Sequence, residues 1–417
     1  MFDSVAQLDG VGSQCTDWTQ FGGSSTQQFM SFGGKPDIVS LAGGLPAAEL
    51  YPVEAIRSAA ERALRIYGAS RLSDAPATGL LPLRQLIADR ISKETGGVFS
   101  AANVLLTTGA TQGLELLGKV LLDRHDLVVA ESPTSLGALD AWRPRCPKYK
   151  KFDWVSKEQW VDAFRGAKFV YTLPNYSDPT GAVVSQGDRG RILDQVVESG
   201  TWLVEDDPYQ SLELDGPTGK SILAHYVERF PGEYRGPVVY LGTVSKTLAP
   251  GLRVGWIVAE PKIIQRLALA KQSRNPSGSV INQAIVYDLI CSEFDRKHVS
   301  KILPEYRLRR DALCAELSTR LRNWFEWEVP GGGMFVWLRS RKNTIDTDVL
   351  YQHALGEKVT FAPSRVFDFA ERDRFAMRLN FTRSDPAMLA QGVQRLERAI
   401  ICYLEAYKDR LLLKGFF

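Results

Sequence analysis

Residues 243–255 read TVSKTLAPGLRVG and directly follow a short apolar run, Val238-Val-Tyr-Leu. A lysine that leaves the end of a buried strand can lose its contact with water, which lowers its pKa and frees the amine to attack an aldehyde. Ser245 and Arg253 flank Lys246, and a guanidinium can bind a phosphate through two parallel hydrogen bonds. Because most lysines are exposed, an exposed loop is the more common explanation of a bare Ser-x-Lys. The rest of the chain therefore has to decide between the two interpretations.

Short runs of β-branched and other apolar residues alternate with helical patterns from Asn103 to about Val258. Continuous apolar runs between helices are typical of strands that are covered on both faces. We therefore predict an α/β fold with a mostly parallel sheet between two layers of helices. Ligands bind to such sheets at the carboxyl ends of the strands, which is where residues 243–255 fall. The expected strands begin at Val104, Leu127, Phe169, Trp202, Val238 and Val254.

The pattern changes after about residue 300, which predicts a smaller α+β domain at 301–417. A charged helix is expected from about Pro304 to Arg322, and a strand is expected after the glycines at 331–333. Residues 359–381 alternate again, and a closing helix is expected from about Asp385. Residues 1–37 are rich in Gly, Ser, Gln and Thr and show little periodicity, so we expect an extended arm there.

Composition excludes several classes of protein. The 51 basic and 48 acidic residues give a net charge of +3, and without a long basic run neither a nucleic acid nor a membrane surface is indicated as a partner. No apolar stretch is long enough to span a bilayer, and the first residues lack the features of a secretory signal. The five cysteines form no C-x-x-C pair, which argues against a metal site and fits a reducing compartment. We expect a cytoplasmic protein without a bound metal.

Residues 243–255 resemble the cofactor-lysine motif of the class I/II aminotransferases, particularly those of the aminoadipate and kynurenine aminotransferase branch. The resemblance extends from about Ile38 to Thr382. These are fold-type I enzymes, and the resemblance implies a mixed seven-stranded sheet in a large domain at 76–300. It also implies that Lys246 holds pyridoxal 5'-phosphate as a Schiff base. Residues 38–75, with Gly44 in the segment Ser40 to Pro46, would form the N-terminal part of the small domain and border the substrate pocket.

A second motif, Thr108-Gly-Ala-Thr-Gln-Gly113, follows a predicted strand and opens a helix. Backbone N–H groups at a helix N-terminus bind phosphate, and glycine permits close approach of a ligand. An ordinary turn between a strand and a helix would have the same appearance. The resemblance implies that Ala110 and Thr111 hold the cofactor phosphate, together with Ser245 and Arg253.

A third motif, Glu205-Asp-Asp-Pro-Tyr209, ends another predicted strand. A carboxylate beside the pyridine nitrogen of the cofactor keeps that nitrogen protonated. The resemblance gives Asp206 this role and places Tyr209 at the phenolic oxygen of the ring. Acidic residues at the end of a strand also cap helices, and we expect Asp207 to do so.

Arg378, within Met377-Arg-Leu-Asn-Phe-Thr, matches the arginine that binds the substrate carboxylate in this family. A guanidinium fits a carboxylate in its own plane, although a structural ion pair is the alternative interpretation. The resemblance therefore implies an amino acid as substrate and a 2-oxo acid as the second one.

Three positions depart from the family pattern. Asp178 in Pro174 to Gly181 replaces an asparagine that donates a hydrogen bond to the phenolic oxygen, and an ionised carboxylate cannot donate. Ser135 replaces a tyrosine that stacks on the cofactor ring, which leaves space there for a bulky substrate or for a different neighbouring residue. Asp74 stands where a tyrosine from the partner subunit would meet the phosphate, although Tyr67-Gly upstream leaves a second register open.

An aminotransferase is the leading hypothesis, with Lys246 as the general base that removes the α-proton of the substrate. Because of the three departures, an alternative is that the same carbanion leads to substitution, cyclisation, carbon–carbon bond formation or oxidation. A remote alternative is a non-catalytic regulator that binds the cofactor, but the segment before Ile38 is too short for the DNA-binding domain of such regulators. The family builds each pocket from two subunits, which implies a homodimer.

Overall fold

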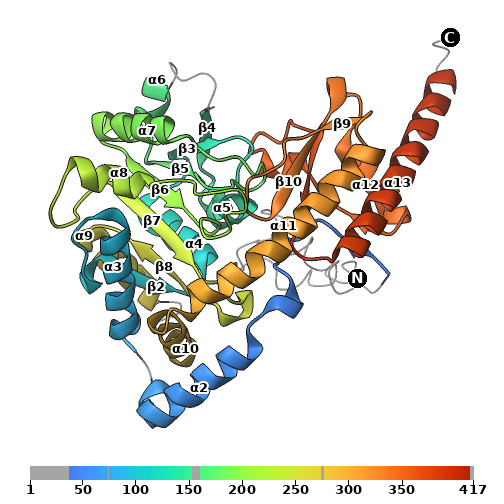
Figure 1. Ribbon diagram of the computed structural model, residues 1–417. Coiled ribbons are helices and arrows are strands. Elements are labelled where there is room, and N and C mark those ends of the chain that lie inside the picture. Colours follow the sequence, from blue (N-terminus) through green and yellow to red (C-terminus); the bar gives the residue numbers. More distant parts are fainter. Residues whose placement is uncertain (1–36, 74, 153–159, 274–276, 414–417) are drawn as a thin grey trace, which may run out of the picture.

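A mixed seven-stranded sheet forms the centre of the larger part of the molecule (Figure 1). The computed structural model describes residues 37–73, 75–152, 160–273 and 277–413. The strand order is β2-β8-β7-β6-β5-β3-β4; β8 is antiparallel to both of its neighbours, and all other neighbours are parallel. This confirms the predicted α/β fold. The strands are β2 (Val104–Thr107), β3 (Leu127–Glu131), β4 (Lys148–Phe152), β5 (Phe169–Thr172), β6 (Trp202–Asp206), β7 (Val238–Thr243) and β8 (Gly255–Val258).

Successive residues of each central strand pack against helices on opposite faces of the sheet. In β5, Phe169 and Tyr171 belong to one apolar cluster and Val170 to the other, and all three are completely buried. A strand covered on both faces needs apolar residues in succession, which explains the continuous runs in the sequence. One face carries α4 (Ala110–Leu121), α5 (Leu136–Trp142) and α9 (Pro261–Gln272). The other carries α3 (Leu81–Thr95), α6 (Trp160–Phe164), α7 (Gln186–Ser199), α8 (Ile222–Arg229) and α10 (Val280–Cys291).

Strand β4, which the sequence did not indicate, forms one edge of the sheet. It pairs with β3 alone, and only Phe152 among its five residues is buried. Its sequence, KYKKF, contains three lysines, which keep an edge strand from pairing with other chains. The strand therefore lacks the apolar run by which its neighbours were predicted.

The C-terminal part contains a four-stranded antiparallel sheet of order β12-β13-β10-β9. A short parallel pair joins β1 near the N-terminus to β11, so residues 39–40 lie beside 359–360. Residues 1–36 of the expected arm lie outside the described residues. The elements are β1 (Val39–Ser40), β9 (Phe325–Glu326), β10 (Phe335–Ser340), α12 (Thr347–Gly356), β11 (Val359–Thr360), β12 (Ala362–Pro363), β13 (Ala376–Asn380) and α13 (Pro386–Leu413).

Helix α11 (Phe294–Arg320) connects the two parts of the molecule (Figure 1). We expected this helix to begin near Pro304, and that expectation was wrong, because Pro304 lies inside it. Proline lacks an N–H group and usually interrupts a helix. Here Ile302 and Tyr306 on either side of the proline are buried in the core, so packing overrides the local preference.

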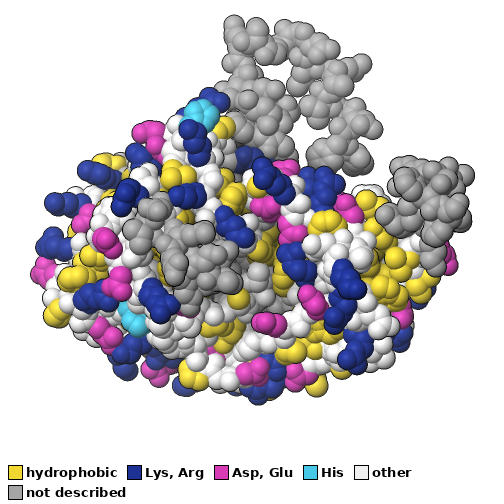
Figure 2. All heavy atoms as spheres, turned by 90° about the horizontal axis from the view of Figure 1, so that it is seen from above, with side chains coloured by type: hydrophobic (Ala, Val, Ile, Leu, Met, Phe, Trp, Pro, Cys, Tyr) yellow, Lys and Arg dark blue, Asp and Glu magenta, His cyan; other side chains and the backbone are white. Residues whose placement is uncertain are grey.

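Helix α2 (Val53–Tyr67) lies at the periphery, where it packs against α10 (Figure 1). Short 3-10 helices form several connections between the elements. They span Ala48–Leu50, Gly68–Arg71, Ala101–Asn103, Arg143–Arg145, Pro250–Leu252, Arg341–Asn343 and Ser364–Phe367. On the face that Figure 2 shows, basic and acidic side chains are intermixed. Within the described ranges, no helix has both the length and the apolar character needed to cross a membrane.

Candidate active site

A cavity of about 660 Å³ lies at the carboxyl ends of the parallel strands. Every candidate residue in the described part of the chain lines this cavity, whereas Asp74 lies outside the described residues. The candidates brought together are Gly44, Ala110, Thr111, Ser135, Asp178, Asp206, Tyr209, Ser245, Lys246, Arg253 and Arg378. They come from seven separate segments: five follow strands of the seven-stranded sheet and meet at one edge of it, while Gly44 and Arg378 come from the segment after β1 and from β13.

Lys246 projects into this cavity from the loop that follows β7. Its Nζ donates a hydrogen bond of 2.7 Å to the carbonyl oxygen of Gly44 and lies 5.9 Å from the centroid of the Tyr209 ring. Burial lowers the pKa of the amine to about 8, while the charge of Asp178 raises the pKa and that of Arg378 lowers it. A larger fraction of this amine is therefore neutral near pH 7 than of an exposed lysine, and a neutral amine can attack an aldehyde.

Asp206, at the end of β6, has one carboxylate oxygen ready for a further partner. Its Oδ2 accepts a hydrogen bond of 2.8 Å from the Tyr171 hydroxyl, whereas its Oδ1 is buried and has no partner among the described residues. Burial raises the pKa of this carboxyl to about 7, and the bond from Tyr171 opposes that rise. A buried acceptor without a donor is costly, and a protonated ring nitrogen would supply both a donor and the opposite charge.

The N-terminus of α4 and the Lys246 loop form a cradle for a phosphate. The first N–H groups of α4, which belong to Ala110 and Thr111, have no acceptor within the helix. Gly109 precedes them with φ 90° and ψ 168°, and a Cβ added there would lie 2.8 Å from Nη2 of Arg253. That Nη2 donates a hydrogen bond of 2.7 Å to the Thr108 carbonyl, and the Ser245 hydroxyl lines the same cavity. Helix amides, a hydroxyl and a guanidinium are the groups that bind phosphate, so these residues fit pyridoxal 5'-phosphate.

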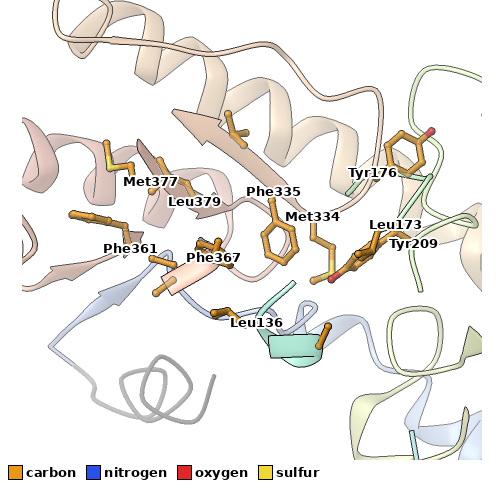
Figure 3. Packing of buried hydrophobic residues seen from close by; sticks show 14 of the residues in the cluster. Leu136, Leu173, Tyr176, Tyr209, Met334, Phe335, Phe361, Phe367, Met377 and Leu379 are labelled. Atoms are coloured by element: carbon orange, nitrogen blue, oxygen red, sulfur yellow. The ribbon is translucent and has the colours of Figure 1, made fainter. Parts of the chain in front are cut away.

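Arg378, on β13, forms the opposite wall of the cavity. Its guanidinium carbon lies 4.1 Å from the centroid of the Phe335 ring and 4.8 Å from that of Phe367. Figure 3 shows both rings within the apolar cluster that also contains Tyr209. Aromatic faces attract a cation and keep water from it, so the arginine is both held in place and desolvated.

Two of the three departures from the family pattern can be located. Asp178 lies in the loop after β5, and its Oδ1 accepts a hydrogen bond from Nη1 of Arg378. Ser135 is the N-cap residue of α5, where its hydroxyl accepts a hydrogen bond of 3.3 Å from the Gly137 N–H. Its small side chain lines the cavity together with Leu136 and Lys246.

Ser221 is the N-cap residue of α8, the helix after β6, and Glu205 binds the same helix N-terminus, so the expectation that Asp207 caps a helix was wrong. Glu205 accepts hydrogen bonds of 2.8 and 2.9 Å from the first two N–H groups of α8. Burial raises its pKa to about 7, while these two amide donors lower it. Asp207 instead accepts hydrogen bonds from the side chains of Asn175 and Tyr240, at 3.0 and 3.2 Å, and from the backbone N–H of Gln210 in the turn after β6. Glu205 and Asp207 are two residues apart and so have the same parity along the strand, and the sequence does not show which of them reaches α8.

Sequence reasoning missed several residues that hold the site in place. Tyr171 donates to Asp206, the Ala42 carbonyl accepts from Nη2 of Arg378 at 2.8 Å, and Asn380 Nδ2 donates to the Gly43 carbonyl at 2.6 Å. Asn380 could have been found, because it lies two residues after Arg378 on a predicted strand and so shares its face. Tyr171 and Ala42 carry no local signal, since each acts through a neighbour that is distant in sequence.

Comparisons with known proteins agree over most of the chain. The model of the family described as aminotransferase class I and II matches residues 36–396. The aromatic-amino-acid aminotransferase 1 of Thermococcus litoralis is 34% identical over 376 residues, which cover 87% of this chain and 88% of that relative.

Two solved structures are similar throughout. One is the alpha-aminoadipate aminotransferase of Thermus thermophilus, complexed with N-(5'-phosphopyridoxyl)-L-leucine; its TM-score is 0.84 at 33% identity, and the match covers 93% of this chain and 96% of that one. The other is a kynurenine aminotransferase from Pyrococcus horikoshii, with a TM-score of 0.86 at 31% identity and coverage of 95% and 99%.

Proposed function

Because this chain belongs to the class I and II aminotransferase family, we propose that it transfers an amino group from an amino acid to a 2-oxo acid, with Lys246 as the residue that moves the proton. The protein is a pyridoxal-phosphate-dependent aminotransferase that acts on amino acids. One observation carries the proposed role of Lys246. Its amine, with a pKa of about 8, shares a cavity with the unpartnered, buried oxygen of Asp206.

Each part of the cavity has a separate task in this proposal. When bound, pyridoxal phosphate supplies an aldehyde that binds amines and a ring that takes up the electron pair left at the α-carbon. Asp206 holds a proton on the ring nitrogen, and Tyr209 binds the phenolic oxygen. The N-terminus of α4 holds the phosphate together with Ser245 and Arg253, and Arg378 binds the carboxylate of the amino acid.

Lys246 serves first as the attachment point for the cofactor and then as the base that moves a proton at the α-carbon. A general base works best when its pKa lies near the pH of the reaction, and burial brings the pKa of this lysine to about 8. The Gly44 carbonyl supports this role, because its hydrogen bond directs the amine into the cavity.

We propose amino acids with large side chains as substrates. The relatives carry the names of aromatic-amino-acid, alpha-aminoadipate and kynurenine aminotransferases. The cavity supports the same class here, since the small Ser135 leaves room and Leu114, Leu136 and Leu173 offer apolar walls.

The test is to load the protein with pyridoxal phosphate and to reduce it with borohydride, which fixes the cofactor to its lysine as a permanent label. Peptide mass then locates this label. We expect the label on Lys246 and none on Lys271, which is a matched internal control because burial lowers its pKa to about 8 as well, outside the cavity. In a separate sample, the loaded protein that has not been reduced is incubated with a panel of aromatic and aliphatic amino acids and 2-oxo acids, and the products are identified by mass. A label elsewhere, or full turnover by Lys246→Ala, would overturn the role of Lys246; products other than a 2-oxo acid would overturn amino-group transfer.

We further propose a homodimer. Helix α2 and the turn after it expose large apolar side chains, among them Ile66 at 62% and Leu72 at 71% exposure. Exposed apolar patches mark interaction sites on soluble proteins. Sedimentation should give a dimer for the natural protein and a monomer for the variant with Ile66→Asp and Leu72→Asp. Met388→Asp, on the distant helix α13, is the control and should remain dimeric (Figure 1).

The division into domains is also a proposal: an arm at 1–37, an N-terminal part of the small domain at 38–75, a large domain at 76–300 and the C-terminal small domain at 301–417. The pairing of β1 with β11 supports the assignment of the start of 38–75 to the small domain. A cytoplasmic location is proposed as well, and it is supported by the four described cysteines, all of which are free.

A further inference from the structure

Arg378 directs its hydrogen bonds to groups of the protein itself. Nη1 donates to Asp178 and Nη2 to the Ala42 carbonyl, while Nε is buried and has no partner among the described residues. A carboxylate ligand is bound most firmly by two parallel N–H groups of one guanidinium. Asp178 already occupies one of the two terminal nitrogens that such a ligand would use.

The Asp178–Arg378 pair is well shielded from water. The two side chains are 11% and 4% exposed, and the rings of Phe335 and Phe367 lie against the guanidinium. Charges in such a setting interact more strongly than at a surface. The negative charge of Asp178 therefore cancels most of the attraction that Arg378 would exert on a second carboxylate.

We propose that Asp178 is a specificity-determining residue that competes with the substrate carboxylate for Arg378. This inference rests on the proposed function, in which Arg378 receives that carboxylate. A ligand carboxylate must displace Asp178 from Nη1, or it must bind beside it with the two like charges sharing one guanidinium. Either route lowers the affinity for every ligand with a free carboxylate at this position.

A consequence concerns the kind of substrate that the site selects. When the substrate carboxylate contributes little to the binding free energy, the affinity depends on the rest of the substrate. The apolar walls formed by Leu114, Leu136 and Leu173 then provide most of the affinity, which favours amino acids with large apolar side chains over small ones.

Calorimetric titration of the loaded protein with two unreactive probes tests the proposal. The probes are 3-phenylpropanoate and 3-phenylpropanamide, which have the same shape and lack an amino group, so that neither can react. Asp178→Asn removes the charge, keeps the shape, and leaves an oxygen that can accept from Arg378. We expect this variant to bind the carboxylate about tenfold more tightly than the natural protein, with the affinity for the amide unchanged within about twofold. In an Arg378→Gln background the gain should vanish, because the two residues act as a pair.

The proposal is overturned if Asp178→Asn changes the affinity for the carboxylate by less than about twofold, or if both probes gain equally. A measurement on the natural protein keeps the test independent of the folding of the variant. The natural protein should bind the two probes with similar affinity, and a preference of about tenfold for the carboxylate would refute competition by Asp178. Failure of the proposed function would appear instead as absent labelling of Lys246 or absent amino transfer, and neither depends on the ratio of the two probes.

Discussion

Replacing Gly109 by alanine should weaken the binding of pyridoxal phosphate through its phosphate. The φ of 90° and ψ of 168° at this position fall in a region that only glycine adopts readily, and holding another residue there costs about 1–3 kcal/mol. The added Cβ would lie 2.8 Å from Nη2 and 3.0 Å from Cζ of Arg253, so the guanidinium has to move. A hydrogen bond to a charged group contributes about 1.5–3 kcal/mol. Because Arg253 is exposed, we take the lower end, which corresponds to roughly a tenfold rise in Kd.

The assay compares pyridoxal phosphate with pyridoxal, which lacks the phosphate, by equilibrium titration of the protein freed of cofactor. Gly109→Ala should raise the Kd for pyridoxal phosphate and leave that for pyridoxal nearly unchanged. Gly200→Ala is the matched control, since Gly200 also has a positive φ, 67°, but a Cβ there would meet nothing within 4 Å. This control should lose thermal stability through the backbone and keep its affinity for the cofactor.

Two results would refute the reasoning. If Gly109→Ala bound pyridoxal phosphate with the natural Kd, the space above α4 would not belong to the phosphate site. If the affinities for pyridoxal and pyridoxal phosphate fell equally, the effect would come from a general loss of structure.

Three further predictions concern the buried titratable groups. The rate at which the cofactor-free protein binds pyridoxal phosphate covalently should rise with pH around a midpoint near 8, because only the neutral Lys246 amine attacks the aldehyde. A midpoint near 10.5, the ordinary pKa of lysine, would contradict this prediction. Asp206→Asn should lower the single-turnover rate about a hundredfold by removing the charge opposite the ring nitrogen, and a loss below about threefold would exclude that role. Lys271→Met removes the donor to the Ala77 and Leu106 carbonyls, at 2.8 and 3.0 Å, and should cost about 1–3 kcal/mol in the free energy of unfolding. The folded-state pKa of Lys271, about 8, lies below its unfolded value of 10.5. The unfolded chain therefore binds more protons between these two pH values, and the free energy of unfolding of the natural protein rises with pH there. Denaturant titrations at pH 8 and pH 10 should show a smaller rise in the free energy of unfolding for Lys271→Met than for the natural protein.

Most of the sheet could be predicted because the covered strands have a local signature. Val104, Phe169 and Val238 each begin a run that is buried on both faces, and such a run is visible in the sequence itself. The edge strand β4 has no such run, because one side of it is open to solvent. The start of α11 was misplaced for a related reason, since the local effect of Pro304 was weighed without the core that holds the helix together.

The candidate residues of the site could be named from the sequence, once the order of the motifs and the family resemblance were added to the local signal at Lys246. The position of Lys246 after a buried strand, with Ser245 and Arg253 nearby, is compatible with a lysine that binds an aldehyde beside a phosphate. These features are local, because a strand end, a loop and the start of a helix are each set by a few consecutive residues.

The tertiary structure alone decided which charged side chains pair with one another. Asp178 and Arg378 are separated by 200 residues, and their pairing depends on how the loop after β5 meets β13. In the same way, Glu205 binds the N-terminus of α8 whereas Asp207 accepts hydrogen bonds from Asn175 and Tyr240. A hydrogen bond needs its two partners within about 3 Å and in line, and local sequence does not specify a geometry between distant segments.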